Sequence, residues 1–339
     1  MDSLTQIVLG AAVANAAVGK KAGNRAVLWG AIGGTIPDLD VFFKYTHSYV
    51  DSLALHRGFS HSILFALIVA PALGWIIAKM YKYKRGTTKQ WVWAMFLALV
   101  THPLLDAFTT WGTALFWPFT EKRAAISSIF VLDPLYTVPF LICLVVSMFY
   151  RKKTTTRAIW NWIGISLSSL YLITTVVNQQ LVNKVFETAW KKQGIEVLRA
   201  DVKPTPMNTV LWTANLETDS SFYLGYYSWF DGNQEIQFQE VSKKHHLLKP
   251  YLIYPEVQQL IRTTVGYYVV EPSDDGIYIH DLRFGQLAGW ESDYGDFVFT
   301  YRLHTFDGKL ISIDQRPNSF EGMDRAFESL FARIKGKHE

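Results

Sequence analysis

The segment HRGFSHS, residues 56–62, places two histidines and an arginine directly before a long apolar run. A second segment, THPLLDAFTTWGT at 101–113, carries His102 and Asp106 four positions apart, and a helix puts both on one face. Polar and charged side chains beside an apolar span indicate either an interaction partner or a function, because their transfer into lipid costs free energy. Imidazole and carboxylate groups are ligands for zinc, manganese and iron, so these segments predict a metal site.

Two further polar clusters interrupt the first half of the chain. GGTIPDLD at 33–40 carries Asp38 and Asp40, and MDSLTQ at 1–6 carries Asp2 and Gln6. Asp38 and Asp40 follow Pro37 where a helix should end, which leaves both carboxylates free to turn inward. Each alone is equally well explained as an interfacial carboxylate. Their occurrence together with the two histidine segments favours a shared metal site.

The spacing within 56–62 does not fit one helical face. His56 and His61 are five positions apart, so we expect His56 in a loop, Ser60 as the N-cap of the following helix, and His61 in the first helical turn. Arg57 either keeps its guanidinium at the membrane interface or neutralises an anionic phosphate or carboxylate. Asp133, in VLDP, is expected to be a helix N-cap, with ligand or ligand-supporting roles as alternatives.

The elements that must position these side chains are long apolar helices. Half of the 339 residues are hydrophobic, and the apolar runs lie in the first 180 residues. Six candidate membrane spans can be assigned, at roughly 3–19, 26–43, 60–80, 91–115, 129–150 and 158–179. Lys and Arg gather in loops 20–25, 79–90 and 151–157, which the positive-inside rule places in the cytoplasm. With six spans, all four polar clusters fall on the opposite side.

The second half of the chain has a different pattern. Period-two segments such as TVLWTANLE, SFYLGYYSWF, GIYIHDLRF and KLISIDQ predict antiparallel strands, and FDGK at 306–309 predicts a hairpin turn. Segments YPEVQQLIRTTVG and DRAFESLFARIKGK predict helices. The sequence therefore indicates a polytopic α-helical membrane domain over 1–180 and a soluble, extracytoplasmic α+β domain rich in antiparallel strands over 185–339.

Composition excludes several classes of site. The single cysteine, Cys143, lies in an apolar run, so no intrachain disulfide or thiolate metal site is available. The net charge of +4 is modest, and the basic residues cluster beside apolar spans, which favours membrane orientation over nucleic-acid binding. The N-terminus has no basic n-region or cleavage motif, so we expect it to be retained.

The set PDLD, HRGFSHS and THPLLDAFTTWGT, in this order between apolar spans, resembles the YdjM-like family of inner-membrane metal-dependent hydrolases over about residues 1–150. The resemblance implies an inner-membrane location and a set of candidate metal ligands: Asp38, Asp40, His56, His61, His102 and Asp106. Many relatives carry a histidine in a THxxxG-like context where this chain has Thr5-Gln6, and an amide binds transition metals more weakly than imidazole. The number of ions in the family therefore does not carry over directly.

These features predict a membrane-embedded hydrolase that uses a divalent ion, zinc first and manganese or iron as alternatives. Asp40 or Asp106 would act as general base and Arg57 would meet an anionic head group. The position near the outer leaflet predicts a membrane lipid or lipid-linked phosphoester as substrate. Two alternatives are an ion or metal transporter and a metal-stapled scaffold or sensor whose outer domain binds a partner.

Overall fold

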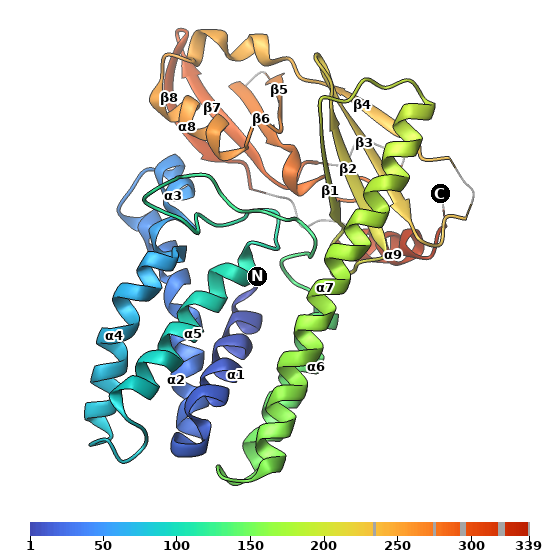
Figure 1. Cartoon of the computed structure of the whole chain (residues 1–339). Coiled ribbons are helices and arrows are strands. Elements are labelled where there is room, and N and C mark those ends of the chain that lie inside the picture. Colours follow the sequence, from blue (N-terminus) through green and yellow to red (C-terminus); the bar gives the residue numbers. More distant parts are fainter. Residues whose placement is uncertain (233–234, 274–275, 292–295, 318–322, 338–339) are drawn as a thin grey trace. The chain divides into compact units, whose positions relative to one another are not determined.

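The computed structural model of the chain describes residues 1–232, 235–273, 276–291, 296–317 and 323–337 (Figure 1). It divides into two compact units. The helical unit comprises residues 1–43, 55–178 and 206–208, and the C-terminal unit comprises residues 44–54, 179–205 and 209–339. Each unit has its own hydrophobic core.

The helical unit is built mainly from apolar helices. Its elements are α1 (Ser3–Ala22), α2 (Asn24–Thr35), the 3₁₀ segment η1 (Ile36–Tyr45), the 3₁₀ turn η2 (Phe59–His61), α4 (Ile63–Met80), α5 (Thr88–Asp106), α6 (Pro134–Phe149) and the first part of α7 (Thr155–Lys192). Side-chain caps fix where these helices begin. Asp2 caps α1, Ser62 caps α4 and Asp133 caps α6, so the N-cap prediction for Asp133 is confirmed.

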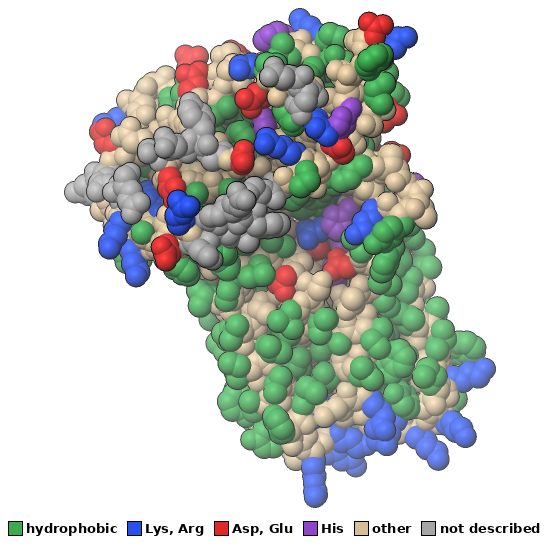
Figure 2. Space-filling model, turned by 180° about the vertical axis from the view of Figure 1, so that it is seen from behind, with side chains coloured by type: hydrophobic (Ala, Val, Ile, Leu, Met, Phe, Trp, Pro, Cys, Tyr) green, Lys and Arg blue, Asp and Glu red, His purple; other side chains and the backbone are tan. Residues whose placement is uncertain are grey.

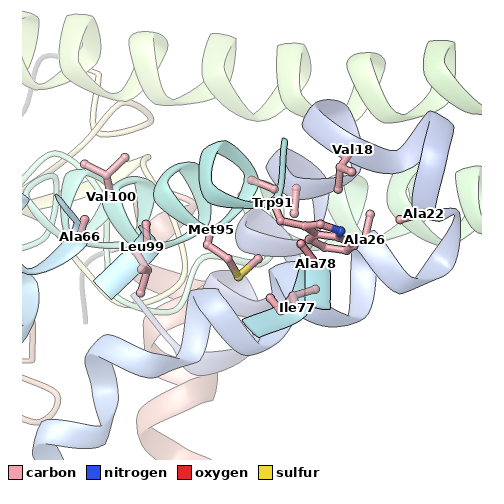
Figure 3. Close-up of a cluster of buried hydrophobic side chains, with 13 residues drawn as sticks. Val18, Ala22, Ala26, Ala66, Ile77, Ala78, Trp91, Met95, Leu99 and Val100 are labelled. Carbon is pink, nitrogen blue, oxygen red and sulfur yellow. The ribbon is translucent and has the colours of Figure 1, made fainter. Parts of the chain in front are cut away.

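Glycines allow α1 and α2 to pack backbone against backbone. A Cβ atom on Gly10 would lie 2.4 Å from the Gly30 carbonyl oxygen, and one on Gly34 would lie 2.4 Å from the carbonyl oxygen of Gln6. No side chain fits in this space, as the small residues of LGAAVANAAVG and WGAIGG predict. Figure 3 shows the neighbouring core, in which Trp91 and Met95 of α5 lie among alanines and other apolar side chains of α1, α2 and α4.

The six predicted spans coincide with helices, but the structure does not support six membrane spans. Three helical stretches are long and apolar enough to cross a membrane, namely Asn24–Tyr45, Ile63–Met80 and Thr155–Lys192. Helix α6 is apolar but shorter. Helices α1 and α5 fall outside this group because they carry polar side chains such as Gln6, Asn15 and His102, which they bury inside the unit rather than expose to lipid.

The surface of the helical unit is apolar along its sides and basic at one end (Figure 2). Exposed apolar side chains include Leu67, Ile68 and Trp75 of α4, and Leu135 and Ile142 of α6. The basic end is formed by Lys and Arg residues in the connections between α1 and α2, α4 and α5, and α6 and α7 and in the helix ends beside them. This distribution is typical of helices in a bilayer.

The C-terminal unit contains two four-stranded antiparallel sheets. The first has the order β1 (Arg199–Pro204), β2 (Leu211–Glu217), β3 (Ser221–Ser228) and β4 (Phe238–Ser242), and the second has the order β5 (Tyr268–Ser273), β6 (Gly276–Asp281), β7 (Thr300–Phe306) and β8 (Lys309–Gln315). The helical elements are α3 (Tyr49–Leu55), η3 (His245–Tyr251), α8 (Pro255–Thr263), η4 (Leu282–Phe284) and α9 (Met323–Ile334). The predicted hairpin turn is confirmed, since Phe306 pairs with Lys309 and both Asp307 and Gly308 have positive φ.

The cores of the C-terminal unit recruit two segments from the first half of the chain. Val182 and Phe186, near the end of α7, pack with Trp212 on the first sheet. Val50 of α3 packs with Val257 of α8 and the apolar side chains of the second sheet. The loop between the second and third predicted spans is therefore part of the C-terminal fold.

Candidate metal centre

Helix α5 presents His102 and Asp106 on one face, as their spacing predicts, and both side chains are fully buried. The Nδ1 atom of His102 lies 2.5 Å from the carbonyl oxygen of Gly34. A carbonyl only accepts hydrogen bonds, so Nδ1 carries the proton and Nε2 keeps its lone pair. The close packing of α1 and α2 thus places the group that sets the tautomer of His102.

His61 lies in the 3₁₀ turn η2, one residue before the N-cap of α4. The prediction that it occupies the first turn of the helix, with Ser60 as N-cap, is wrong: Ser62 is the cap, and its Oγ accepts from Phe65 N at 3.0 Å. Nδ1 of His61 lies 3.2 Å from an Asp40 carboxylate oxygen. That contact leaves Nε2 of His61, like that of His102, available as a ligand atom.

Four side chains converge: Asp38, His61, His102 and Asp106. The two Nε2 atoms are 3.2 Å apart. Asp38 Oδ1 lies 3.4 Å from His61 Nε2 and 3.3 Å from His102 Nε2, and Asp106 Oδ2 lies 3.5 Å from both. A tetrahedral ion with bonds of about 2.1 Å separates its ligand atoms by about 3.4 Å. The cluster could therefore hold a metal ion with little movement of its side chains.

Unpaired polar atoms around Asp106 support the same fit. Asp106 Oδ2, Gln6 Oε1 and Arg57 Nε are buried and accept or donate no hydrogen bond within the described part of the chain. A buried polar atom without a partner costs about 1–3 kcal/mol. A cation among the four ligand atoms would satisfy Asp106 Oδ2, which lies in ion-pair range of both histidines.

Asp40 and His56, both predicted as ligands, lie outside this group of four. Asp40 accepts hydrogen bonds from His56 Nδ1 at 2.9 Å, from the Arg57 amide at 2.8 Å and from Ser60 Oγ at 2.9 Å. It also faces Nδ1 of His61. Asp40 thus stands behind a ligand, in the position from which a carboxylate orients a metal-bound histidine.

Arg57 enters the site from the same loop. Its side chain is buried, NH1 donates to Thr109 Oγ1 at 3.0 Å, and Nε lies 3.3 Å from Asp106 Oδ2. Its φ of 58° is unusual for a residue other than glycine. Hydrogen bonds from its amide to Asp40 and from the Ala114 amide to its carbonyl hold this backbone in place.

The first polar cluster reaches the site through Gln6 rather than Asp2. Gln6 Nε2 donates to Asp106 Oδ1 at 3.0 Å and to the His102 carbonyl at 3.3 Å. The Met1 amino group also contacts Asp106. Asp2 caps α1, and Asp133 accepts a hydrogen bond from the Tyr171 hydroxyl while it caps α6. Neither belongs to the four-residue group.

Sequence reasoning missed two supporting groups, the Gly34 carbonyl and the Ser60 hydroxyl. A signal for the first was present, because glycines at 30, 33 and 34 predict a close helix crossing beside Asp38. Nothing in the sequence separates Ser60 from Ser62 as the cap.

Residues 1–182 match the sequence model of the family described as YdjM inner membrane protein. The uncharacterized protein YfhP of Bacillus subtilis is 27% identical over 239 residues, which is 66% of this chain and 68% of YfhP. The inner membrane protein YbcI of Escherichia coli is 34% identical over 102 residues, covering 29% of this chain and 57% of YbcI. No solved structure matches the chain.

Proposed function

We propose that this chain, which belongs to the YdjM inner membrane protein family, is a metal-dependent hydrolase that holds its ion with Asp38, His61, His102 and Asp106. The observation that carries the proposal is the set of five ligand-atom separations between 3.2 and 3.5 Å. Nitrogen and oxygen donors at this spacing suit zinc best, with manganese and iron as the next choices.

The ion supplies Lewis acidity and an activated water when it is bound. The residues of the chain would orient the ligands of the ion and balance the charge around it. Asp40 already accepts three hydrogen bonds, so we assign it the orientation of His61 rather than proton abstraction from water. Arg57 forms an ion pair with Asp106 through Nε, which makes no hydrogen bond of good geometry, and this cation suits an anionic substrate oxygen.

The surroundings of Asp38 favour an amphiphilic substrate. Asp38 is the most exposed ligand, with 24% of its side chain accessible, whereas the side chains of the other three are fully buried. The next residues of η1 expose large apolar side chains, with Leu39 at 51% and Phe42 at 58%. A cationic arginine and an apolar rim together favour a lipid or lipid-linked phosphoester over a small hydrophilic ester.

The charge distribution supports an orientation for this site. The basic loops form one end of the helical unit, and the four ligands lie at the other ends of the helices that carry them. If the basic end is cytoplasmic, the site lies at the outer leaflet and the C-terminal unit is extracytoplasmic. Cysteine accessibility at Lys82→Cys and Lys309→Cys, in a Cys143→Ser background, tests this orientation.

A transporter is the weaker alternative. A permeation pathway needs polar groups through the depth of the membrane. Among the residues that the structure describes, only one group of three or more His, Cys, Asp and Glu side chains is close enough to hold an ion, and it lies at one end of the unit.

Metal content of detergent-purified protein is the first experiment. We expect about one zinc, manganese or iron per chain, lost in His61→Ala and His102→Ala, followed by release of phosphate or a phosphorylated head group from a panel of lipid phosphoesters. A wild-type protein that binds no divalent metal would overturn the proposal. A protein that binds metal but hydrolyses no lipid phosphoester would overturn the proposed substrate class, whereas the proposed metal centre would stand.

A further inference from the structure

The connection between α5 and α6 carries an exposed apolar tip. Residues 113–120, TALFWPFT, contain no charged side chain, and the first charged residues after them are Glu121 and Lys122. Within this 113–120 loop, Phe116 is 58% exposed and Phe119 is 89% exposed. Large aromatic side chains exposed together in this way mark a surface that binds an apolar partner or a membrane.

Backbone hydrogen bonds hold the loop in one conformation. Thr113 and Ala124 exchange both of their amide-to-carbonyl hydrogen bonds, at 3.1 Å and 2.8 Å. At the tip, the amides of Phe119 and Thr120 both donate to the Phe116 carbonyl, at 2.9 Å and 3.4 Å. The exposure of the two phenyl rings is therefore a consequence of an ordered turn.

The loop is continuous with a helix that is apolar enough to cross a membrane. The Ile63 amide, at the start of α4, donates to the Leu115 carbonyl at 3.0 Å. The Phe59 ring lies 4.9 Å from the Trp117 ring and 5.3 Å from the Phe65 ring of α4. Helix α4 is one of the candidate spans. The loop therefore lies where a span begins, at the level where aromatic side chains gather in membrane proteins.

The loop also contacts the candidate metal centre. The Ala114 amide donates to the Arg57 carbonyl at 3.1 Å. Thr113 Oγ1 donates at 3.2 Å to the carbonyl of Pro103, which follows His102 on α5. The exposed tip and the candidate ligands thus belong to the same end of the helical unit.

We propose that the 113–120 loop is a membrane anchor whose tip inserts Phe116 and Phe119 into the lipid leaflet beside the candidate metal centre. Apolar rings on an ordered, uncharged turn partition into the boundary between head groups and acyl chains. The exposed Glu121 and Lys122 then lie among the head groups. One consequence rests on the proposed function: a lipid substrate reaches the metal centre from the leaflet without passing through water.

Fluorescence at position 119 tests the anchor. Phe119→Cys in the Cys143→Ser background is labelled with an environment-sensitive dye and reconstituted into vesicles of phosphatidylethanolamine and phosphatidylglycerol with spin-labelled acyl chains. Ile68→Cys, at an exposed position of α4, is the lipid-facing control, and Lys84→Cys, in the connection between α4 and α5, is the aqueous control. We expect the dye at position 119 to emit further to the blue than at position 84 and to be quenched by the spin label as at position 68.

Two results would overturn the anchor. Quenching at position 119 that is no stronger than at position 84 would place the tip in water. A dye that neither the spin-labelled lipid nor aqueous iodide quenches would show that protein covers the tip. These measurements need no enzymatic activity, so they decide the anchor whether or not the chain proves to be a hydrolase.

The route of the substrate has its own test. Phe119→Ser weakens the anchor, and Phe149→Ser is the matched control, because this ring is 85% exposed at the basic end. We expect Phe119→Ser alone to raise KM for a phospholipid in vesicles about tenfold, because less aromatic surface enters the lipid. Metal content and KM for a short-chain phosphoester dissolved in water should stay at the wild-type values. Equal losses on both substrates would reject entry from the leaflet, and a wild-type protein that hydrolyses neither would reject the proposed function, while the fluorescence still decides the anchor.

Discussion

The helical unit buries two polar clusters, one at each end of its helices, and they differ in how their hydrogen bonds are completed. At the basic end, Arg157 donates to Asn15 Oδ1 at 2.8 Å and 3.2 Å and to Asn24 Oδ1 at 2.7 Å. Asn15 in turn donates to Asn161 Oδ1, and Asn161 donates to the Ala12 carbonyl. None of these side chains has a buried polar atom without a partner.

The other cluster, at the proposed metal centre, is incomplete. Asp106, Gln6 and Arg57 each retain a buried polar atom without a hydrogen bond, and two histidine nitrogens face each other at 3.2 Å. Both clusters carry charge in an apolar setting, where an unpaired polar group is costly. The network around Arg157 joins α1 to α7, and its buried polar atoms all have hydrogen-bond partners. The cluster around Asp106 has polar atoms that a bound cation could satisfy. The two clusters therefore differ in how completely their hydrogen bonds are made, not in their polarity.

The largest expected effect comes from replacing the histidines of the incomplete cluster. His61→Ala or His102→Ala should reduce bound metal from about one ion per chain to a background level, because each removes a nitrogen donor from a four-ligand site. Elemental analysis of purified protein measures this. Arg157→Met is the control and should retain full metal content; an equal loss in all three variants would mean that the change reflects misfolding.

Asp40→Asn tests whether the Asp40 carboxylate orients His61 through its Nδ1 atom. The amide keeps the size of the carboxylate but lacks its charge, so His61 is less firmly oriented and less basic. We expect metal affinity to fall about 10–100-fold with stoichiometry unchanged at saturating metal. Competition with a chelator of known affinity measures the change. Complete loss of binding at saturation would instead place Asp40 among the ligands, as the family resemblance implied.

Arg157→Met tests the role of the completed network at the basic end. It keeps the apolar stem but leaves the buried Asn15 Oδ1 without its donor, whereas the exposed Asn24 can bond water, so the free energy of unfolding should fall by about 2 kcal/mol. Thermal or denaturant unfolding in detergent measures this, while metal affinity stays at the wild-type value. An unchanged unfolding free energy would show that water replaces the arginine at that end.

The smallest expected effect concerns a third buried polar group, His280 on β6 of the C-terminal unit. Its Nδ1 lies 2.9 Å from Thr300 Oγ1 and its Nε2 lies 3.1 Å from Glu271 Oε2. Burial lowers the pKa of His280 below its usual value, although Glu271 opposes this shift and the charges of Arg316 and Asp296 also act on it. The folded state therefore favours the neutral imidazole.

The unfolded chain then takes up this proton first as pH falls. Stability from His280 is fully present above about pH 6.5 and declines below it, towards the lower folded-state pKa. Hydrogen exchange of β6 at pH 7 and pH 5 should show this decline in wild type and a weaker one in His280→Gln. An identical pH dependence in both proteins would assign the effect to other groups.

The sequence predicted the convergence of the site better than the roles of its members. A shared centre was predicted because the six assigned spans placed all four polar clusters on one side, and the structure brings Asp38, His61, His102 and Asp106 together although it does not support six spans. Asp40 and His56 have the same side-chain chemistry as ligands, and only the hydrogen bonds around Asp40 distinguish support from coordination. Residue types indicate what could bind an ion, whereas the geometry shows which atoms face one another.

The fold, too, was predicted only in part. Strands β2, β3, β6 and β8 were predicted because their sequences alternate apolar and polar residues, but β1 and β4 were missed. Both are edge strands of the first sheet with partly exposed, charged sequences such as RADVKP and FQEVS. Helix α3 was missed because seven residues are too few to show a helical period. The structure supports three candidate spans rather than the six predicted, since α1 and α5 bury polar side chains inside the unit and α6 is shorter.

The glycine contact between α1 and α2 has a consequence for how the chain is assembled. Because backbone meets backbone there, α1 has the composition of a buried helix and is not among those apolar enough to cross a membrane. Such a helix gains little from lipid alone. It is joined to α2 through the single residue Gly23, so the two helices form a natural hairpin. We expect α1 to reach its place only together with α2, so the order of insertion during synthesis becomes a condition for bringing Gln6 of α1 and the Gly34 carbonyl of α2 to the candidate site.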